Sequence, residues 1–174
     1  SSERERYASV IAAGIGDGIN LIDTAINYRC QRSERAVGEA LKRSISAGSA
    51  SRDELVICTK GGYVPLDGMP PASRSEYDAY LDQEYFKPGI ISPKDLVGGG
   101  HCLRPRFLAN QIDRSRVNLG IDCIDVFYIH NPEQQLDALN HQMFAAVMRD
   151  VITEMENQVD SGKIASYGFA TWNG

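Results

Sequence analysis

Four residues with useful chemistry stand at related places in the chain. Asp23, Lys60 and His130 each close a short run of mostly apolar residues, and Tyr28 follows Asp23 by five positions. Runs of this length and composition are typical of buried strands. A carboxylate, a phenol, an ammonium group and an imidazole that meet in one cleft can protonate a carbonyl oxygen. The set therefore predicts general acid catalysis on a carbonyl compound.

Each member of the set has a specific task in such chemistry. A free phenol is too weak an acid at neutral pH, and a nearby ammonium group makes a phenol more acidic. Lys60 can supply the ammonium group for Tyr28, and Asp23 can hold Lys60 by an ion pair. His130 can donate a hydrogen bond to the substrate oxygen. Taken singly, each residue could instead be an ordinary turn or strand-end residue, but their joint placement favours a site.

These residues need a scaffold that brings strand ends together. Strands are predicted over 19–23, 55–60, 124–130 and 164–171, with helix-like segments between them. Such alternation indicates a parallel sheet with right-handed crossovers. In a (β/α) barrel, chemistry collects at the carboxyl ends of the parallel strands. The expected fold class is therefore α/β, specifically a (β/α)8 TIM barrel of which this chain supplies a part.

The helices are expected from apolar spacing and from capping residues. The first carries Tyr7, Val10 and Ile11 at helical spacing. The second begins after Ser33, a good N-cap, and the third has Leu108, Ile112, Ser115 and Leu119 facing inward. The predicted ranges are 3–13, 34–47, 105–118 and 135–161.

The chain has 174 residues, whereas a complete barrel usually needs about 250. We therefore expect residues 1–174 to form a single, partial barrel domain, taken from a longer protein, since the sequence begins Ser-Ser without Met. The alternative is a small open α/β domain. A partial barrel leaves unpaired sheet edges, so weak or no activity is expected of this chain alone.

Residues 61–103 are rich in Gly, Pro, Asp and Tyr. Loops of this length are rare in compact domains unless they are functional or disordered. We interpret them as an insertion loop at the mouth of the site, with a short helix near 75–83. The insertion could cover a substrate, or it could be a surface or oligomer-contact element.

Composition excludes several other classes of function. The net charge of −5 argues against a nucleic-acid partner, and no run of 18 apolar residues is present to cross a membrane. The four cysteines form no CxxC pair, and free thiols fit a reducing, cytoplasmic setting. His101 and Cys102 with Cys30 lack the spacing of a structural zinc site, so no metal is expected. The glycines at 98–100 lack the context of a phosphate-binding loop.

Several motifs resemble the aldo-keto reductases. The segment Gly18-Ile-Asn-Leu-Ile-Asp-Thr-Ala25, with Tyr28, Ser33-Glu34 and Gly38, looks like the signature of that family. Thr59-Lys60 resembles its lysine strand, Tyr128-Ile-His130 with Pro132 its histidine strand, and Gly162-Lys-Ile164 through Gly168 the approach to its fifth strand. The resemblance implies an NADP(H)-dependent carbonyl reductase with the catalytic tetrad Asp23, Tyr28, Lys60 and His130. It also implies that the chain holds the first helix through the fifth strand.

The chain departs from the family pattern in ways that bear on its ligands. Ala170-Thr171-Trp172 replaces the usual Ser-Asn, so Thr171, together with Asp23, is the expected cofactor contact. Asn131 replaces an aromatic residue after the histidine. With Tyr28 and His130, Asn131 is expected to contact a small carbonyl substrate, and its polarity hints at a hydroxylated or sugar-like one. NAD in place of NADP remains open, as does the oligomeric state.

Two other functions compete with the reductase. A regulatory or scaffold subunit could keep the barrel and the cofactor with little turnover, although the intact tetrad argues against it. A metal-dependent barrel hydrolase would need a His-x-His pair at a strand end, and none is present.

Overall fold

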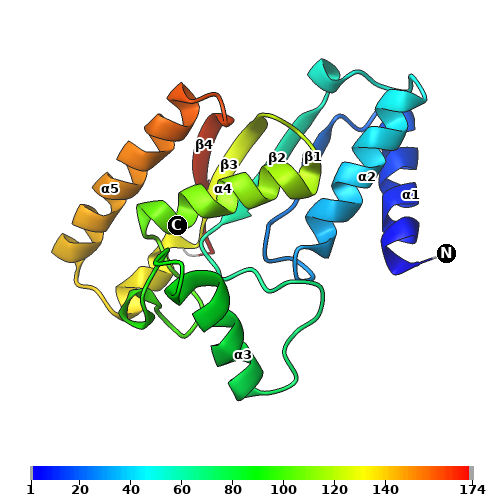
Figure 1. Ribbon diagram of the computed structural model, residues 1–174. Coiled ribbons are helices and arrows are strands. Elements are labelled where there is room, and N and C mark those ends of the chain that lie inside the picture. Colours follow the sequence, from blue (N-terminus) through cyan, green and yellow to red (C-terminus); the bar gives the residue numbers. More distant parts are fainter. Residues whose placement is uncertain (1, 173–174) are drawn as a thin grey trace.

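The computed structural model describes residues 2–172 and contains a four-stranded parallel sheet (Figure 1). The strands lie in the order β1-β2-β3-β4, so each strand pairs with its neighbour in the sequence. All three pairings are parallel, which confirms the alternation predicted from the sequence. The strands are β1 Leu21–Asp23, β2 Val56–Gly61, β3 Ile124–His130 and β4 Ile164–Ala170.

Helices connect the strands and cover one face of the sheet (Figure 1). Ile57, Phe127 and Ile129 point from the strands into the main core, where they meet residues of α4 and α5. The inward face predicted for the third helix is confirmed, because its four residues are all buried. The helices are α1 Glu3–Gly16, α2 Arg32–Ser46, α3 Arg74–Leu81, α4 Pro105–Leu119 and α5 His141–Asp160.

The opposite face of the sheet carries the residues singled out for chemistry. Asp23 stands in register with Cys58, Lys60 with Tyr128, and His130 with Ala170. Side chains two positions apart on a strand share a face, and so do partners across parallel strands. Asp23, Lys60 and His130 therefore lie on the face away from the core, near the carboxyl ends of their strands.

Two predicted helix starts are wrong. Ser33 is not an N-cap, because α2 already begins at Arg32, after Gln31 in a left-handed conformation. The last helix does not begin near 135, because Pro132–Asp137 forms a separate 3-10 turn. Asn140 then caps α5, accepting a hydrogen bond from the backbone N–H of Met143 at 2.9 Å.

The spacing that predicted α1 did not identify its buried face. Tyr7 is 47% exposed and Val10 is 73% exposed, whereas Ala8 and Ile15 are buried. Tyr7 instead lies under the guanidinium group of Arg29, 3.8 Å from its ring centroid. Helical periodicity predicted the element, and of the three residues that carried it only Ile11 packs against the main core, beside Ile15.

The insertion is more ordered than a loop. The short helix expected near 75–83 is α3, and a π-helical turn, Asp82–Phe86, continues it. A second apolar cluster, built around Tyr85, Phe107 and Leu81, packs this segment against the start of α4. The insertion lies at the end of the sheet where the carboxyl ends of the strands are found (Figure 1).

Within residues 2–172, no helix combines the length and the apolar composition needed to cross a membrane.

Candidate active site

Lys60 is the buried centre of the site. It is 8% exposed, and its Nζ atom contacts Asp23 Oδ2 at 2.6 Å and donates to the backbone oxygen of Thr24 at 2.8 Å. Asp23 is the more exposed partner, with 48% of its side chain accessible. A buried ammonium group requires a charge partner and hydrogen bonds. Asp23 at the end of β1 and Thr24 just after it supply both, which fixes Lys60 near the end of β2.

Tyr28 reaches the same place from the loop between β1 and α2. The Nζ atom of Lys60 is 5.4 Å from the centroid of the Tyr28 ring, within the range of a cation–π contact. The Tyr28 ring meets the His130 ring edge-on, with 6.0 Å between centroids. Tyr28 is 41% exposed, so its ring faces both the site and solvent. The structure thus brings all four predicted residues together.

His130 is held neutral by its surroundings. Burial lowers its pKa to about 4, and the positive charge of Lys60 and the nearby His101 act in the same direction. The Nδ1 atom of His130 is buried and has no hydrogen-bond partner among the described residues. We assign the proton to Nε2, since an unpaired acceptor is tolerated better than an unpaired donor. His130 can then donate from Nε2 without carrying charge.

Two residues of the insertion, Tyr63 and His101, contact His130. The sequence predicted the insertion at the mouth of the site but not these contacts. The ring of Tyr63 lies edge-on to both His101 and His130, with centroid distances of 4.8 and 5.1 Å. His101 Nε2 donates to the backbone oxygen of His130 at 2.8 Å, and Gln135 Nε2 donates to His101 Nδ1 at 2.8 Å. His101 drew attention in the sequence only as a candidate metal ligand. Both of its ring nitrogens are used here in hydrogen bonds.

Gly62, two residues after Lys60, allows this close packing. A Cβ atom on Gly62 would lie 2.9 Å from the His130 backbone oxygen, and the φ of Gly62 is +143°. Gln111 of α4 is fully buried and holds this turn, accepting from Gly62 N at 2.8 Å and donating to Tyr63 O at 2.6 Å. The turn therefore has little freedom to move away from His130.

Asn131 and Thr171, the predicted ligand contacts, differ in burial and in whether their side chains are already hydrogen-bonded. We assign the amide nitrogen and oxygen of Asn131 so that both have hydrogen-bond partners. The nitrogen then donates to Ala170 O at 3.0 Å, and the oxygen accepts from Trp172 Nε1 at 2.9 Å and from Tyr63 Oη at 3.1 Å. Asn131 is also buried. Thr171 is exposed, so its hydroxyl is open to a ligand.

Two further features of residues 2–172 concern a metal site and a hollow away from the four site residues. These residues contain no group of three or more His, Cys, Asp or Glu side chains placed to hold a metal ion. A hollow of about 760 Å³ lies between α2 and the segment from Leu119 to Asp125, on the helix side of the sheet. None of the four site residues lines that hollow.

Comparison with known proteins gives a family match over almost the whole chain. Residues 1–173 match the sequence profile of the Aldo/keto reductase family. A 6-dehydroglucose reductase of Novosphingobium aromaticivorans is 27% identical over 171 residues, which are 95% of this chain and 41% of the relative. The chain thus spans about two fifths of the length of that relative.

Solved structures show the same fold. An aldo-keto reductase from Bacillus halodurans, in its holo form, superposes on 99% of this chain with a TM-score of 0.65 and 18% identity; the match covers 43% of that protein. An aldo-keto reductase from Bombyx mori in complex with NADP matches 97% of this chain, and 41% of its own chain, with a TM-score of 0.56 and 19% identity. The four-stranded sheet is therefore part of a (β/α)8 barrel, as predicted.

Proposed function

This chain belongs to the aldo/keto reductase family, and from that premise we propose that it is part of an NADP(H)-dependent enzyme that reduces an aldehyde or ketone to an alcohol. One observation carries the proposal. Lys60 lies between the carboxylate of Asp23 and the ring of Tyr28, and Tyr28 in turn meets a neutral His130. The relatives with reductase names support the reaction class.

The residues present fit a nicotinamide cofactor. Toward its carboxyl end, β4 presents the small residues Ser166, Gly168 and Ala170 on the face it shares with His130. The exposed Thr171 adds a hydroxyl that can bond a carboxamide, and the half-exposed Asp23 offers a carboxylate. NADP(H), when bound, would supply the hydride. The NADP complex of the Bombyx mori relative supports this cofactor.

The roles of the four residues follow from their surroundings. Tyr28 delivers the proton to the carbonyl oxygen, because it is partly exposed and lies beside a fixed ammonium group. Lys60 provides that charge, and Asp23 keeps Lys60 in place. His130 is neutral and donates a hydrogen bond that orients the carbonyl. A neutral donor suits this task, since it polarises the oxygen without replacing Tyr28 as the source of the proton.

The substrate is proposed to be a small, hydroxylated or sugar-like carbonyl compound. The name of the Novosphingobium relative, a 6-dehydroglucose reductase, supports this class. Asn131, proposed as a substrate contact, already bonds Tyr63 and Trp172. A direct contact between Asn131 and the substrate would have to exchange one of these bonds. The four free cysteines support a reducing, cytoplasmic setting.

The experiment that tests this proposal compares Tyr28→Phe with the wild type in the full-length protein. NADPH oxidation with a sugar-derived aldehyde is followed by absorbance, and NADPH binding is measured separately. We expect Tyr28→Phe to lose roughly 100-fold or more in kcat, because general acid catalysis contributes about 10²–10⁴-fold. Its NADPH affinity should stay close to that of the wild type.

Tyr7→Phe is the matched control. Tyr7 also loses one hydroxyl, at an exposure of 47% against 41% for Tyr28, and should keep full activity. Equal losses in the two variants would contradict the role of Tyr28. NADPH binding without any turnover in the wild type would instead favour a regulatory subunit.

A further inference from the structure

The loop that carries Tyr28 has an unusual backbone. Arg29, Cys30 and Gln31 are three consecutive residues with left-handed φ values of 51°, 55° and 66°. None of them is glycine, and an L-residue in this conformation brings its Cβ too close to the following carbonyl. Runs of such residues persist only where neighbouring structure holds them, and they concentrate at functional sites. The contacts that hold this turn therefore also fix Tyr28, the residue immediately before it.

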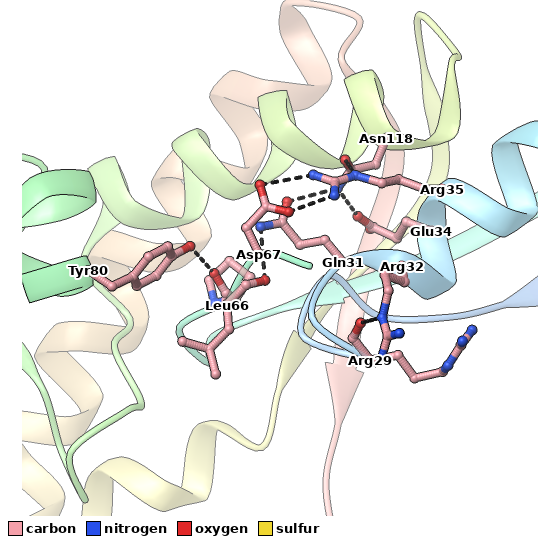
Figure 2. A network of polar contacts seen from close by, with 10 residues as sticks. Arg29, Gln31, Arg32, Glu34, Arg35, Leu66, Asp67, Tyr80 and Asn118 are labelled. Atoms are coloured by element: carbon pink, nitrogen blue, oxygen red, sulfur yellow. Dashed lines mark hydrogen bonds and ion pairs between the residues drawn. The ribbon is translucent and has the colours of Figure 1, made fainter. Parts of the chain in front are cut away.

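The insertion supplies one group of these contacts (Figure 2). The backbone N–H of Gly68 donates to Cys30 O at 3.0 Å, and Gln31 Nε2 donates to Leu66 O at 3.1 Å. Asp67 binds both terminal nitrogens of Arg35, at 2.6 and 3.1 Å. Bidentate pairs of this kind fix direction as well as distance. Residues 66–68 thus hold the left-handed turn and the first turn of α2 at the same time.

A second network of hydrogen bonds, largely buried, joins the left-handed turn to Asn118 of α4 (Figure 2). Asn118 Nδ2 donates to Gln31 Oε1 at 3.1 Å and to Glu34 Oε2 at 2.9 Å. Glu34 is fully buried and accepts from Thr59 Oγ1 at 2.6 Å. Thr59 directly precedes Lys60, so this network joins the Tyr28 loop to the lysine strand. Arg35 takes part in both groups, since its Nε donates to Asn118 Oδ1 at 3.0 Å.

We propose that Asp67, acting through Arg35 and the backbone of residues 66–68, is a positioning residue for Tyr28. In this view the insertion sets the distance between Tyr28 and Lys60, rather than serving only as a cover for substrate or as a contact between subunits. The proposal rests on the proposed function, because it assumes that Tyr28 is the acid. It adds a residue outside the tetrad, whose carboxylate is bonded to Arg35.

The test uses Asp67→Asn in the full-length protein, with Asp78→Asn as the matched control. Asp78 pairs with Arg74 in the same insertion, but that pair is exposed and local to α3. Hydrogen exchange is measured on peptides that cover residues 26–34, together with kcat, KM and the Kd for NADPH. In Asp67→Asn we expect faster exchange at residues 32 and 33, whose backbone N–H groups donate to Arg29 O and Tyr28 O across the turn. We also expect a loss of roughly 10- to 100-fold in kcat, as small misplacements of a catalytic group produce. The Kd for NADPH should change less than about twofold, since the Asp67 carboxylate bonds Arg35 and not Asp23 or Thr171, the proposed cofactor contacts.

Asp67→Glu tests whether the carboxylate itself matters. It retains the charge and a route to Arg35, and should recover most of the lost kcat. Unchanged exchange at residues 32 and 33 in Asp67→Asn would overturn the proposal, and so would faster exchange with unchanged kcat. A change confined to KM would overturn it in favour of a substrate cover.

The two proposals can fail separately. A wild type that binds NADPH without turnover contradicts the proposed function and, with it, the catalytic part of this inference. The exchange data do not depend on turnover, so they still decide whether Asp67 holds the Tyr28 loop.

Discussion

At the scale of single residues, burial sets the charge of His130. The residue is 8% exposed, has an unpaired Nδ1 atom and lies near the cation of Lys60. Each of these features disfavours a second proton on the ring. His130 therefore remains a neutral hydrogen-bond donor throughout the physiological pH range, as its proposed role requires.

This neutrality predicts a pH dependence of stability. The pKa of His130 falls from 6.5 to about 4 on folding, so between these values the unfolded chain binds a proton that the folded chain does not. The free energy of unfolding should consequently decrease as the pH falls from about 6.5 to about 4, and this contribution should level off below pH 4. Denaturant unfolding at a series of pH values would show a shallower decrease in His130→Gln than in the wild type.

His141→Gln is the control for this series, because His141 is exposed at the start of α5. Its pH dependence should match that of the wild type. His101 acts in the same direction as His130, since burial also lowers its pKa, so His130→Gln should retain part of the decrease. Identical slopes for wild type and His130→Gln would show that His130 is not held neutral.

The sequence predicted the members of the site better than their supports. Asp23, Lys60 and His130 could be found because strands of a parallel sheet end on one edge, so strand-end residues must be neighbours. Tyr63 and His101 could not, because their contact with His130 depends on the path of the insertion. Gln31 was also missed, since no local signal marks a left-handed glutamine.

At the scale of elements, Gly38 sets how closely α2 approaches α4. A Cβ atom at this position would lie 2.6 Å from Asn118 O and 2.7 Å from Leu119 O. Both atoms belong to the backbone, so neither can rotate away as a side chain could. The contact matters for the site, because Asn118 at this crossing also bonds Gln31 and Glu34.

Gly38→Ala should therefore destabilise the chain by about 1–3 kcal/mol, as overpacking does. The higher helix propensity of Ala, worth about 1 kcal/mol, is not expected to offset the clash. Gly16→Ala at the end of α1 is the control, since no atom lies within 4 Å of its added Cβ. Denaturant midpoints would decide the matter: a Gly38→Ala variant as stable as Gly16→Ala would refute close packing at this crossing.

Predictions of helices and strands succeeded where apolar spacing alone determines the element. They failed where a capping preference or a tertiary contact also acts. Apolar spacing was enough to predict the inner face of α4 and the four strands. The start of α2 was misplaced because Ser33 is a residue type that favours the N-cap position. The left-handed turn ends at Gln31, so the helix already begins at Arg32. The order within 61–103 was underestimated, since its apolar cluster is completed by Phe107 of α4, outside the insertion.

At the scale of the whole molecule, the sheet has two outer strands. β1 and β4 each pair on one side only within the described chain. Apolar side chains are exposed along both, with Leu21 56% and Phe169 47% accessible. Unpaired backbone groups beside apolar side chains form a template for another strand. The relatives, which are more than twice as long, have further chain that can occupy such edges.

We therefore expect the 174-residue chain on its own to self-associate through these strands. Sedimentation velocity over a range of concentrations should show a mass that grows with concentration. A Leu21→Lys, Phe169→Lys double variant should shift the chain towards monomer, because lysine on an outer strand opposes pairing. Val117→Lys is the matched control: Val117 is 81% exposed on α4, away from both outer strands, so its replacement should leave the association unchanged. A wild-type chain that stays monomeric at every concentration would contradict the prediction. Equal effects of the Leu21→Lys, Phe169→Lys variant and the Val117→Lys variant would show that the chain associates through a surface other than the outer strands.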